Sequence, residues 1–262
     1  LAAAAAAPYY APASVFGATP PSERITLACI GLGNQGFPNM QSFLKFDDCQ
    51  VVAVCDVNRG SHGYKDPKHF YGREPAREAV DQHYASKQAS GNYKGCEAYV
   101  DYREVLARDD VDAVMIVSPD HWHSVQTVEA ANAKKDIYCE KPLGLTIADQ
   151  QAMVDAVRKN NIVLQTGSHE RSNPNVRRAC ELVRNGRLGE IHTVKVGLPT
   201  GRPIGPQPEM PVPDGFDYDF WLGPAPDAPY TKERCHWNFR WILDYSGGQL
   251  TDWAAHHVDI AN

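Results

Sequence analysis

Between residues 25 and 185, short apolar runs alternate with longer stretches that have the amphipathic pattern of helices. The runs that we expect to form strands are 25–30, 50–55, 112–117, 136–139 and 162–166. The stretches that we expect to form helices are 37–46, 74–87, 102–109, 122–134, 146–159 and 174–185. Alternation of this kind predicts a parallel sheet with helices on both faces. We therefore expect an α/β protein with a doubly wound sheet at its N-terminal end.

The pattern changes after Gly189. Residues 191–197 alternate between apolar and polar side chains, like a strand with one face in solvent. A long proline-rich loop follows, and an aromatic segment then leads to a helix that begins near Gln249. Loops of this length in compact enzymes often carry function. We place a domain boundary at residue 170 and expect residues 171–262 to form an α+β domain whose sheet is incomplete.

The junction between the first expected strand and the first expected helix has the spacing of a dinucleotide-binding loop. Gly31, Gly33 and Gly36 form a G-x-G-x-x-G, with Asn34 and Gln35 between the last two glycines. The first glycine allows a sharp turn, the second lets backbone amides approach a pyrophosphate, and the third lets the helix pack closely. The positive end of the helix dipole also favours phosphate. Residues 23–170 are therefore predicted to form an NAD-binding Rossmann domain.

An acidic residue at the end of the second expected strand bears on the choice of cofactor. Asp56 can accept hydrogen bonds from the hydroxyl groups of the adenosine ribose. Because a carboxylate there repels a 2′-phosphate, NAD is favoured over NADP. Arg59 lies nearby and could serve a 2′-phosphate, so NADP stays an alternative. The other interpretation of the whole stretch is a glycine-rich turn in an unrelated α/β protein.

Composition argues against several classes of partner. The chain has 262 residues, of which 43% are hydrophobic, and a formal net charge of −6. No basic patch is present, so we do not expect nucleic acid binding. No apolar run is long enough to span a membrane. The seven cysteines have no disulfide-framework or C-x-x-C spacing, and those in expected strands are interpreted as small apolar residues.

The N-terminal end resembles part of an export sequence. Leu1 is followed by a run of alanines and then by a Pro- and Tyr-containing stretch that Pro20 and Pro21 close. This is the apolar core and small-residue tail of an export signal without its basic start. We interpret residues 1–22 as an export-signal remnant and linker, which predicts a periplasmic or otherwise exported protein. The alternative is a disordered leader on a cytoplasmic protein. With a C-terminal end inside a helical pattern, the sequence looks like a fragment.

Polar residues gather where expected strands end, which is where ligands bind in a doubly wound sheet. One such loop follows the strand over 112–117, and another follows the strand over 136–139. A further segment, 247–257, opens the last expected helix. The candidate residues in these three segments are Ser118, Pro119, His123, Glu140, Lys141, Asp252 and His256.

The last segment offers acid–base chemistry. Asp252 and His256 are four residues apart and would share one helix face, so the carboxylate could orient the imidazole or both could reach one substrate. Histidine suits proton transfer because its pKa lies near neutrality. Lys141 could polarise a hydroxyl or a carbonyl. Taken singly, each of these residues is as well explained by an ordinary structural role. The histidine spacings do not place two ligands on one helix face, so we expect no metal site.

In combination, the motifs resemble the Gfo/Idh/MocA oxidoreductase family, the relatives of glucose–fructose oxidoreductase and inositol dehydrogenase. The resemblance rests on the glycine loop, Ser-Pro-x-x-x-His, Glu-Lys-Pro and Gly-Gly-x-x-x-Asp-x-x-x-His, in this order over residues 23–262. It is closest to the exported members with an alanine-rich leader. It implies a C-terminal domain with an open, mostly antiparallel sheet, truncated here. Because this sheet commonly forms subunit contacts in the family, a homo-oligomer is expected.

The resemblance also implies roles for single residues. Lys141 would contact both the nicotinamide and the substrate. Asp252 and His256 would lie on the opposite wall, with His256 as the proton acceptor. The remaining implied cofactor contacts are Ser118, Pro119, His123 and Glu140, the last beside the ribose. The segment that begins at His169 matches the family only loosely, which leaves the role of Arg171 open.

We therefore predict an oxidoreductase that transfers a hydride between a sugar or polyol carbinol and a tightly bound nicotinamide cofactor. Because little free NAD is available outside the cytoplasm, an exported member would have to reoxidise its cofactor on the same site. The alternative is an NAD-dependent glycoside hydrolase or epimerase that works by transient oxidation with no net redox change. A non-catalytic nucleotide-binding protein is the third possibility.

Overall fold

The sheet at the centre of the molecule has six strands in the order β3-β2-β1-β4-β5-β6, and every pairing is parallel. The computed structural model describes residues 23–64, 67–88, 91, 93–201 and 204–262. The strands are β1 (Ile25–Ile30), β2 (Cys49–Cys55), β3 (Glu97–Tyr99), β4 (Ala113–Ile116), β5 (Asp136–Glu140) and β6 (Leu164–Gly167). The strand order reverses between β1 and β4, which is where doubly wound sheets bind ligands. The predicted Rossmann sheet is confirmed.

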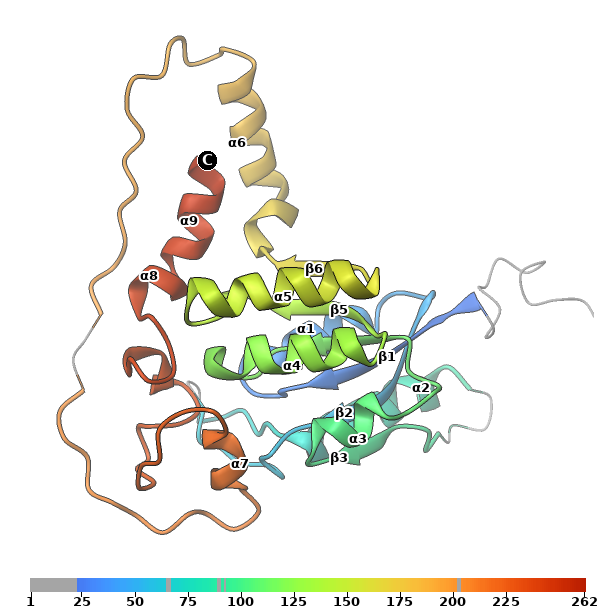
Figure 1. Ribbon diagram of the computed structural model, residues 1–262. Helices are drawn as coiled ribbons and strands as arrows, with labels where there is room; N and C mark the ends of the chain where they lie inside the picture. Colours follow the sequence, from blue (N-terminus) through green and yellow to red (C-terminus); the bar gives the residue numbers. More distant parts are fainter. Residues whose placement is uncertain (1–22, 65–66, 89–90, 92, 202–203) are drawn as a thin grey trace, which may run out of the picture.

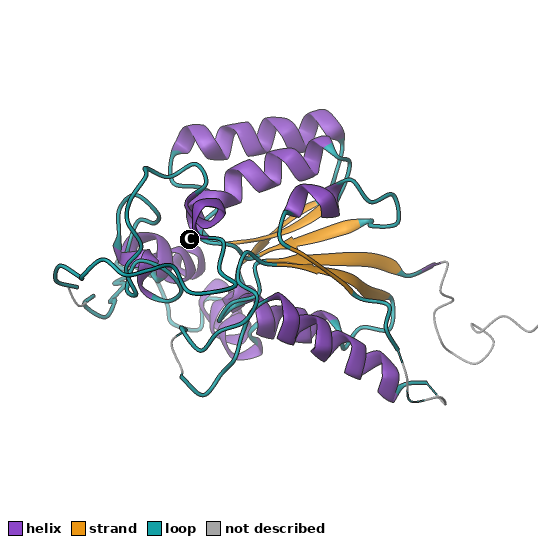
Figure 2. Cartoon of the chain, turned by 90° about the horizontal axis from the view of Figure 1, so that it is seen from below, coloured by secondary structure: helices purple, strands orange, loops and turns teal. Residues whose placement is uncertain are grey.

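Helices cover both faces of this sheet (Figure 2). One face carries α1 (Gly36–Phe43) and α2 (Arg73–Ser86), and the other carries α3 (Tyr102–Leu106), α4 (Asp120–Asn132) and α5 (Ile147–Asn160). Successive residues of β1 point alternately into the two cores, Leu27 and Cys29 into one and Ala28 and Ile30 into the other. Because both faces are buried, the strands are apolar at nearly every position.

The C-terminal third of the chain is helical and irregular in its described part. It contains η3 (His169–Ser172), α6 (Pro174–Arg184), α7 (Tyr218–Leu222), η4 (Asn238–Trp241), α8 (Gln249–Asp252) and α9 (Ala254–Ala261). In Figure 1, α6 and α9 rise together above the sheet, and a long connection descends from α6 to α7. No described helix is both long and apolar enough to cross a bilayer. The predicted leader, 1–22, lies outside the described residues, and the boundary at residue 170 stays a prediction.

The strand that the sequence predicts over 191–197 is not formed. This segment belongs to the connection between α6 and α7, and its apolar side chains Ile191, Val194 and Val196 are exposed. An alternation of apolar and polar residues is compatible with a strand, but a strand forms only where a neighbouring strand supplies hydrogen bonds. The opposite error concerns β3, which the sequence pattern missed. It is only three residues long and lies at the sheet edge, so it has no apolar run to reveal it.

A separate aromatic core lies beside the carboxyl ends of the strands, and we call residues 213–246 the aromatic module. Its buried members include Phe216, Tyr218, Trp221, Tyr230 and Tyr245. The module attaches to the loop after β2 by backbone hydrogen bonds, from the amide of residue 217 to the carbonyl of residue 57 (3.0 Å) and from that of residue 59 to the carbonyl of residue 215 (2.7 Å).

The module also attaches to the first turn of α4. The carbonyl oxygen of Trp221 lies 2.9 Å from Nε2 of His121 and accepts a hydrogen bond of 3.0 Å from Nε1 of Trp122. Burial lowers the pKa of His121 to about 4. His236, in the module, packs against the rings of Tyr64 and Phe216, and burial lowers its pKa to about 4 as well. Both histidines are therefore neutral in the folded protein at neutral pH.

The close packing of α1 against the glycine loop leads to a prediction about stability. A Cβ on Gly36 would lie 1.8 Å from the carbonyl oxygen of Gly31. We predict that Gly36→Ala lowers the free energy of unfolding by about 1–3 kcal/mol, because the helix must move away from the loop. Urea denaturation measures this. Gly197→Ala is the matched control, since no described atom lies within 4 Å of a Cβ there. Equal stability of the two variants would contradict the packing argument.

Because the buried histidines have lowered pKa values, we expect the stability of the protein to depend on pH. The pKa of His236 is about 4 in the folded protein and 6.5 for the ordinary side chain, so the unfolded state takes up the proton first as the pH falls. Stability must then decrease on acidification, by about 2 kcal/mol between about pH 7 and about pH 5 for this one group.

Urea denaturation at both pH values checks this sign and size. His236→Asn removes the titrating group, and asparagine tolerates the positive φ of 57° at this position. The loss of stability on acidification should be smaller by about 2 kcal/mol in this variant. The exposed His192, replaced by Asn, is the control and should leave the loss unchanged. An identical loss in wild type and His236→Asn would refute the prediction.

Candidate active site

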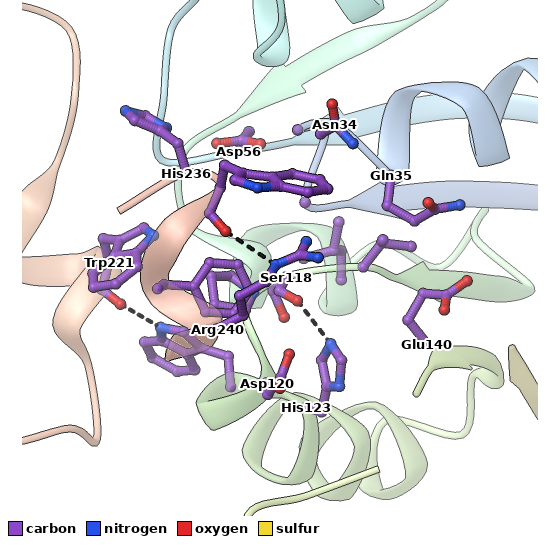
Figure 3. Close-up of a pocket in the computed structure, with 18 of the residues that line it drawn as sticks. Asn34, Gln35, Asp56, Ser118, Asp120, His123, Glu140, Trp221, His236 and Arg240 are labelled. Atoms are coloured by element: carbon purple, nitrogen blue, oxygen red, sulfur yellow. Dashed lines mark hydrogen bonds between the residues drawn. The ribbon is translucent and has the colours of Figure 1, made fainter. Parts of the chain in front are cut away.

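A cavity of about 530 Å³ opens at the carboxyl ends of the strands, between the glycine loop and the aromatic module. Figure 3 shows Asn34, Gln35 and Asp56 on one side of this cavity, Asp120 and His123 on the other, and Arg240 between them. Every residue predicted from the sequence to bind cofactor or to act in catalysis lines the cavity, with the exception of Gly36. Tertiary structure therefore brings the separate motifs into one place, as the topology predicts.

The glycine loop has the geometry that a dinucleotide requires. Gly31 has a φ of +82°, and a Cβ on it would lie 2.5 Å from the backbone of Val117 and Ser118, so only glycine fits. The loop thus lies directly against the end of β4. Gly33 faces the ring of Tyr64, which a Cβ would approach to 2.6 Å. The segment after β2 therefore folds over the glycine loop and forms the roof of the cavity at this end.

Asp56 lies at the end of β2, beside the glycine loop. One carboxylate oxygen accepts a hydrogen bond of 2.6 Å from the amide of Leu32, and the other accepts one of 2.7 Å from the amide of Asn58. Burial raises the pKa of this carboxyl, although both amides oppose the shift. Each oxygen retains a lone pair for a ribose hydroxyl. Arg59, which would serve a 2′-phosphate, is not part of the cavity wall in the described structure. The residues present therefore fit NAD.

The carboxylate of Asp252 lies between two cations. Its Oδ1 is 2.9 Å from Nζ of Lys141, and its Oδ2 is 2.8 Å from a terminal guanidinium nitrogen of Arg240. The Arg240 guanidinium also lies 3.7 Å from the ring centroid of Trp237 and donates through Nε to that residue's carbonyl oxygen. Sequence reasoning missed Arg240, because nothing in the spacing of the aromatic segment marks one arginine as a site residue.

The single helix predicted to carry Asp252 and His256 is broken. α8 ends at Asp252 and α9 begins at Ala254, with Trp253 between them. The amide of His256 bonds to the carbonyl of Trp253, and the carbonyl of Asp252 instead accepts a hydrogen bond of 3.0 Å from Nζ of Lys141. The two side chains are therefore not on one continuous helix face, yet both line the cavity. The Lys141 ammonium thus donates to a carbonyl oxygen that, because of the helix break, accepts no hydrogen bond from the His256 amide.

Glu140 is a buried carboxylate with several donors. Oε1 accepts hydrogen bonds from Nε2 of His169 (2.6 Å), the hydroxyl of Tyr138 (2.9 Å) and Nδ2 of Asn39 (2.8 Å). Burial alone would raise the pKa of Glu140, but these bonds outweigh it and the pKa is lowered. The ring of His169 lies 5.2 Å from that of His256. Sequence reasoning did not identify His169, because the segment that it begins matches the family only loosely.

Two further candidates have mainly structural contacts. Nδ1 of His123 lies 2.6 Å from the carbonyl oxygen of Pro142, and Nε2 lies 2.7 Å from that of Ser118. This imidazole ties the loop after β4 to the loop after β5, and a cofactor contact for it stays a prediction. Arg171 forms an exposed ion pair with Asp259 (2.7 Å) and does not line the described cavity. Among the described residues, no group of three or more His, Cys, Asp or Glu could hold a metal ion.

Comparison with known proteins identifies the family. Residues 65–168 match a model of an oxidoreductase family with an NAD-binding Rossmann fold, and residues 173–262 match a model of that family's C-terminal α/β domain. A crystal structure of scyllo-inositol dehydrogenase from Lactobacillus casei, with bound NAD(H) and scyllo-inositol, is similar with a TM-score of 0.50. The identity is 25%, over 64% of this chain and 43% of that chain.

Two curated relatives illustrate the range of the family. The chain is 30% identical over 182 residues to a myo-inositol 2-dehydrogenase of Thermotoga maritima, which covers 70% of this chain and 46% of the relative. It is 27% identical over 182 residues to a glycosyl hydrolase family 109 protein 1 of a Shewanella species, which covers 68% of this chain and 36% of the relative. The aligned part of this chain thus spans less than half the length of these relatives. The two family models, with the fold and motifs described above, show that this chain belongs to the Gfo/Idh/MocA oxidoreductase family.

Proposed function

We propose that this protein is an NAD-dependent oxidoreductase that acts on a carbinol of a sugar or cyclic polyol. The observation that carries the proposal is the meeting of Lys141, Asp252 and His256 in the cavity that also contains the glycine loop. An ammonium from the loop after β5 thus meets a carboxylate and an imidazole from the C-terminal helices in this one place. The similarity to inositol dehydrogenases supports a polyhydroxylated substrate.

The glycine loop and Asp56 would hold the cofactor. The backbone amides of the loop suit the pyrophosphate, and the remaining lone pairs of Asp56 suit the adenosine ribose. When bound, NAD supplies a nicotinamide ring that accepts or returns a hydride at the carbinol carbon. Its reactive end would lie toward Lys141, since the glycine loop and Asp56 occupy the other end of the cavity wall.

His256 would accept the hydroxyl proton of the substrate. Burial lowers its pKa, and the positive charges of Lys141 and His169 lower it further, so the imidazole is neutral at neutral pH and able to accept a proton. The Lys141 ammonium would stabilise the developing alkoxide. Asp252 would act as the counter-ion that holds Lys141 and Arg240, because each of its oxygens already faces one of these cations.

A second candidate function is a glycosidase or epimerase cycle with transient oxidation and no net redox change. The similarity to a glycosyl hydrolase family 109 protein favours it. In such a cycle the cofactor would stay bound from one turnover to the next. Cofactor retention would also suit an exported protein. Export and assembly into a homo-oligomer are part of the proposal.

The two candidates separate in one experiment on the full-length protein. We expect nicotinamide cofactor to be found by mass spectrometry after purification, and a screen of sugars and polyols to change the absorbance of the reduced cofactor. Cleavage of a glycoside without added NAD and without net reduction would favour the second candidate. Tight NAD binding with no response to any sugar, polyol or glycoside would contradict both and leave a non-catalytic protein.

The assignment of the base predicts the effect of His256→Gln. Loss of a positioned proton acceptor should lower kcat by about 10²–10⁴-fold, while cofactor affinity stays close to that of the wild type. Steady-state kinetics with the identified substrate measure the first, and fluorescence titration with NAD measures the second. His192→Gln, an exposed histidine in the connection after α6, is the control and should have wild-type kinetics. Full turnover by His256→Gln would exclude it as the base.

A further inference from the structure

His169 forms an ion pair with Glu140, a residue of the cavity wall, and its ring lies beside that of the proposed base His256. Glu140 ends β5, and His169 begins η3, just after β6. The two strands are neighbours, and Glu140 pairs in register with Gly167. A Cβ on Gly167 would lie 2.6 Å from Oε1 of Glu140, so the glycine leaves room for the carboxylate. Nε2 of His169 then reaches this oxygen at 2.6 Å.

The carboxylate is held rigidly from its other side. Asn39, on α1, and Tyr138, on β5, donate to the same oxygen as His169, and the amide of Lys141 donates to the second oxygen at 3.3 Å. The Glu140 side chain is only 4% exposed. A desolvated carboxylate needs a compensating positive charge, and His169 is the cationic partner in direct side-chain contact. The bond to Glu140 raises the pKa of His169, which favours the imidazolium.

His169 in turn faces His256. Their ring centroids are 5.2 Å apart, with an angle of 36° between the ring planes. The other charged groups that act on His256 come from the loop after β5, from η3 and from α9 itself. They are Glu140, Lys141, Glu170 and Asp259. Lys141 is paired with Asp252, and Asp259 is paired with Arg171. His169 and Glu140 form a further ion pair in this set, and a substitution of His169 changes the charge that faces His256.

We propose that His169, held in place by Glu140, is a positioning residue that orients the His256 imidazole and keeps it in the neutral, proton-accepting form at neutral pH. This rests on the proposed function, in which His256 is the base. The cationic ring blocks protonation of its neighbour by charge repulsion, and its packing restricts the tilt of the His256 ring. A neutral residue at position 169 would leave the Glu140 carboxylate to act on His256 without the opposing charge. The proton would then bind His256 more readily.

The direct test is an NMR titration of His256 in the full-length protein, with its ring signals assigned by their loss in His256→Gln. His169→Gln keeps a donor to Glu140 but removes the charge. The midpoint of the His256 titration should rise by roughly 1 pH unit in this variant. His169→Lys keeps a positive charge and should stay close to the wild-type midpoint. His192→Gln is the matched control and should leave the midpoint unchanged.

Activity supplies the second readout. The acid limb of the pH profile of kcat/KM should move upward with the NMR midpoint in His169→Gln, and His169→Lys should restore it. An unchanged midpoint in His169→Gln, or an equal shift in His169→Lys, would show that His169 has only a packing role and would overturn the inference. A protein without turnover on any sugar or polyol would refute the proposed function. The NMR titration would still decide whether His169 controls His256, so the two failures are distinguishable.

Discussion

The ion-paired carboxylate of Asp252 is the interaction on which the site depends. Lys141 comes from the end of β5 in the Rossmann domain, Arg240 comes from the aromatic module, and Asp252 ends α8. One carboxylate thus joins the loop after β5 to two C-terminal segments, the aromatic module and α8. All three side chains are mostly buried, so removing the shared charge would leave two cations facing each other with little solvent to screen them. The C-terminal segment is attached to the cofactor domain by the same carboxylate that holds Lys141 in the cavity.

The same principle applies to the other buried carboxylates of the cavity wall, but each is compensated differently. Asp56 is held by backbone amides, which is possible because it lies where the glycine loop and the loop after β2 converge. Glu140 is held by His169 and three neutral donors, which are Tyr138, Asn39 and the backbone amide of Lys141. These fixed partners leave the charges in place before any ligand arrives. Such preorganised charge is what an active site needs in order to stabilise a developing alkoxide without reorganising.

The arrangement also explains why one family can contain dehydrogenases and glycosidases. The sheet and the glycine loop would position a nicotinamide cofactor, and in the proposed chemistry His256 accepts a proton from a neighbouring hydroxyl while Lys141 stabilises the alkoxide. The hydride either stays on the cofactor or returns to the substrate within the same turnover. Which of the two happens depends on whether a leaving group is eliminated, or a stereocentre is inverted, next to the oxidised carbon. That outcome is determined by the loops around the substrate and by the cofactor's residence time, not by the core of the fold.

The sequence by itself determined the doubly wound sheet, the glycine loop, Asp56 at the tip of β2, the loop that carries Lys141 and the helical segment that carries His256. These features follow from hydrophobic period and from short-range spacing, which are local properties of the chain. Only the tertiary structure decided that Arg240 lines the site and that His169 contacts it through Glu140 and His256, that the last helix breaks at Trp253, and that residues 191–197 form no strand. Each of these depends on a partner in the folded chain: the Asp252 carboxylate for Arg240, the Glu140 carboxylate and the His256 ring for His169, the Lys141 ammonium that donates to the carbonyl oxygen of Asp252, or a neighbouring strand for residues 191–197. Spacing along one chain does not reveal such partners.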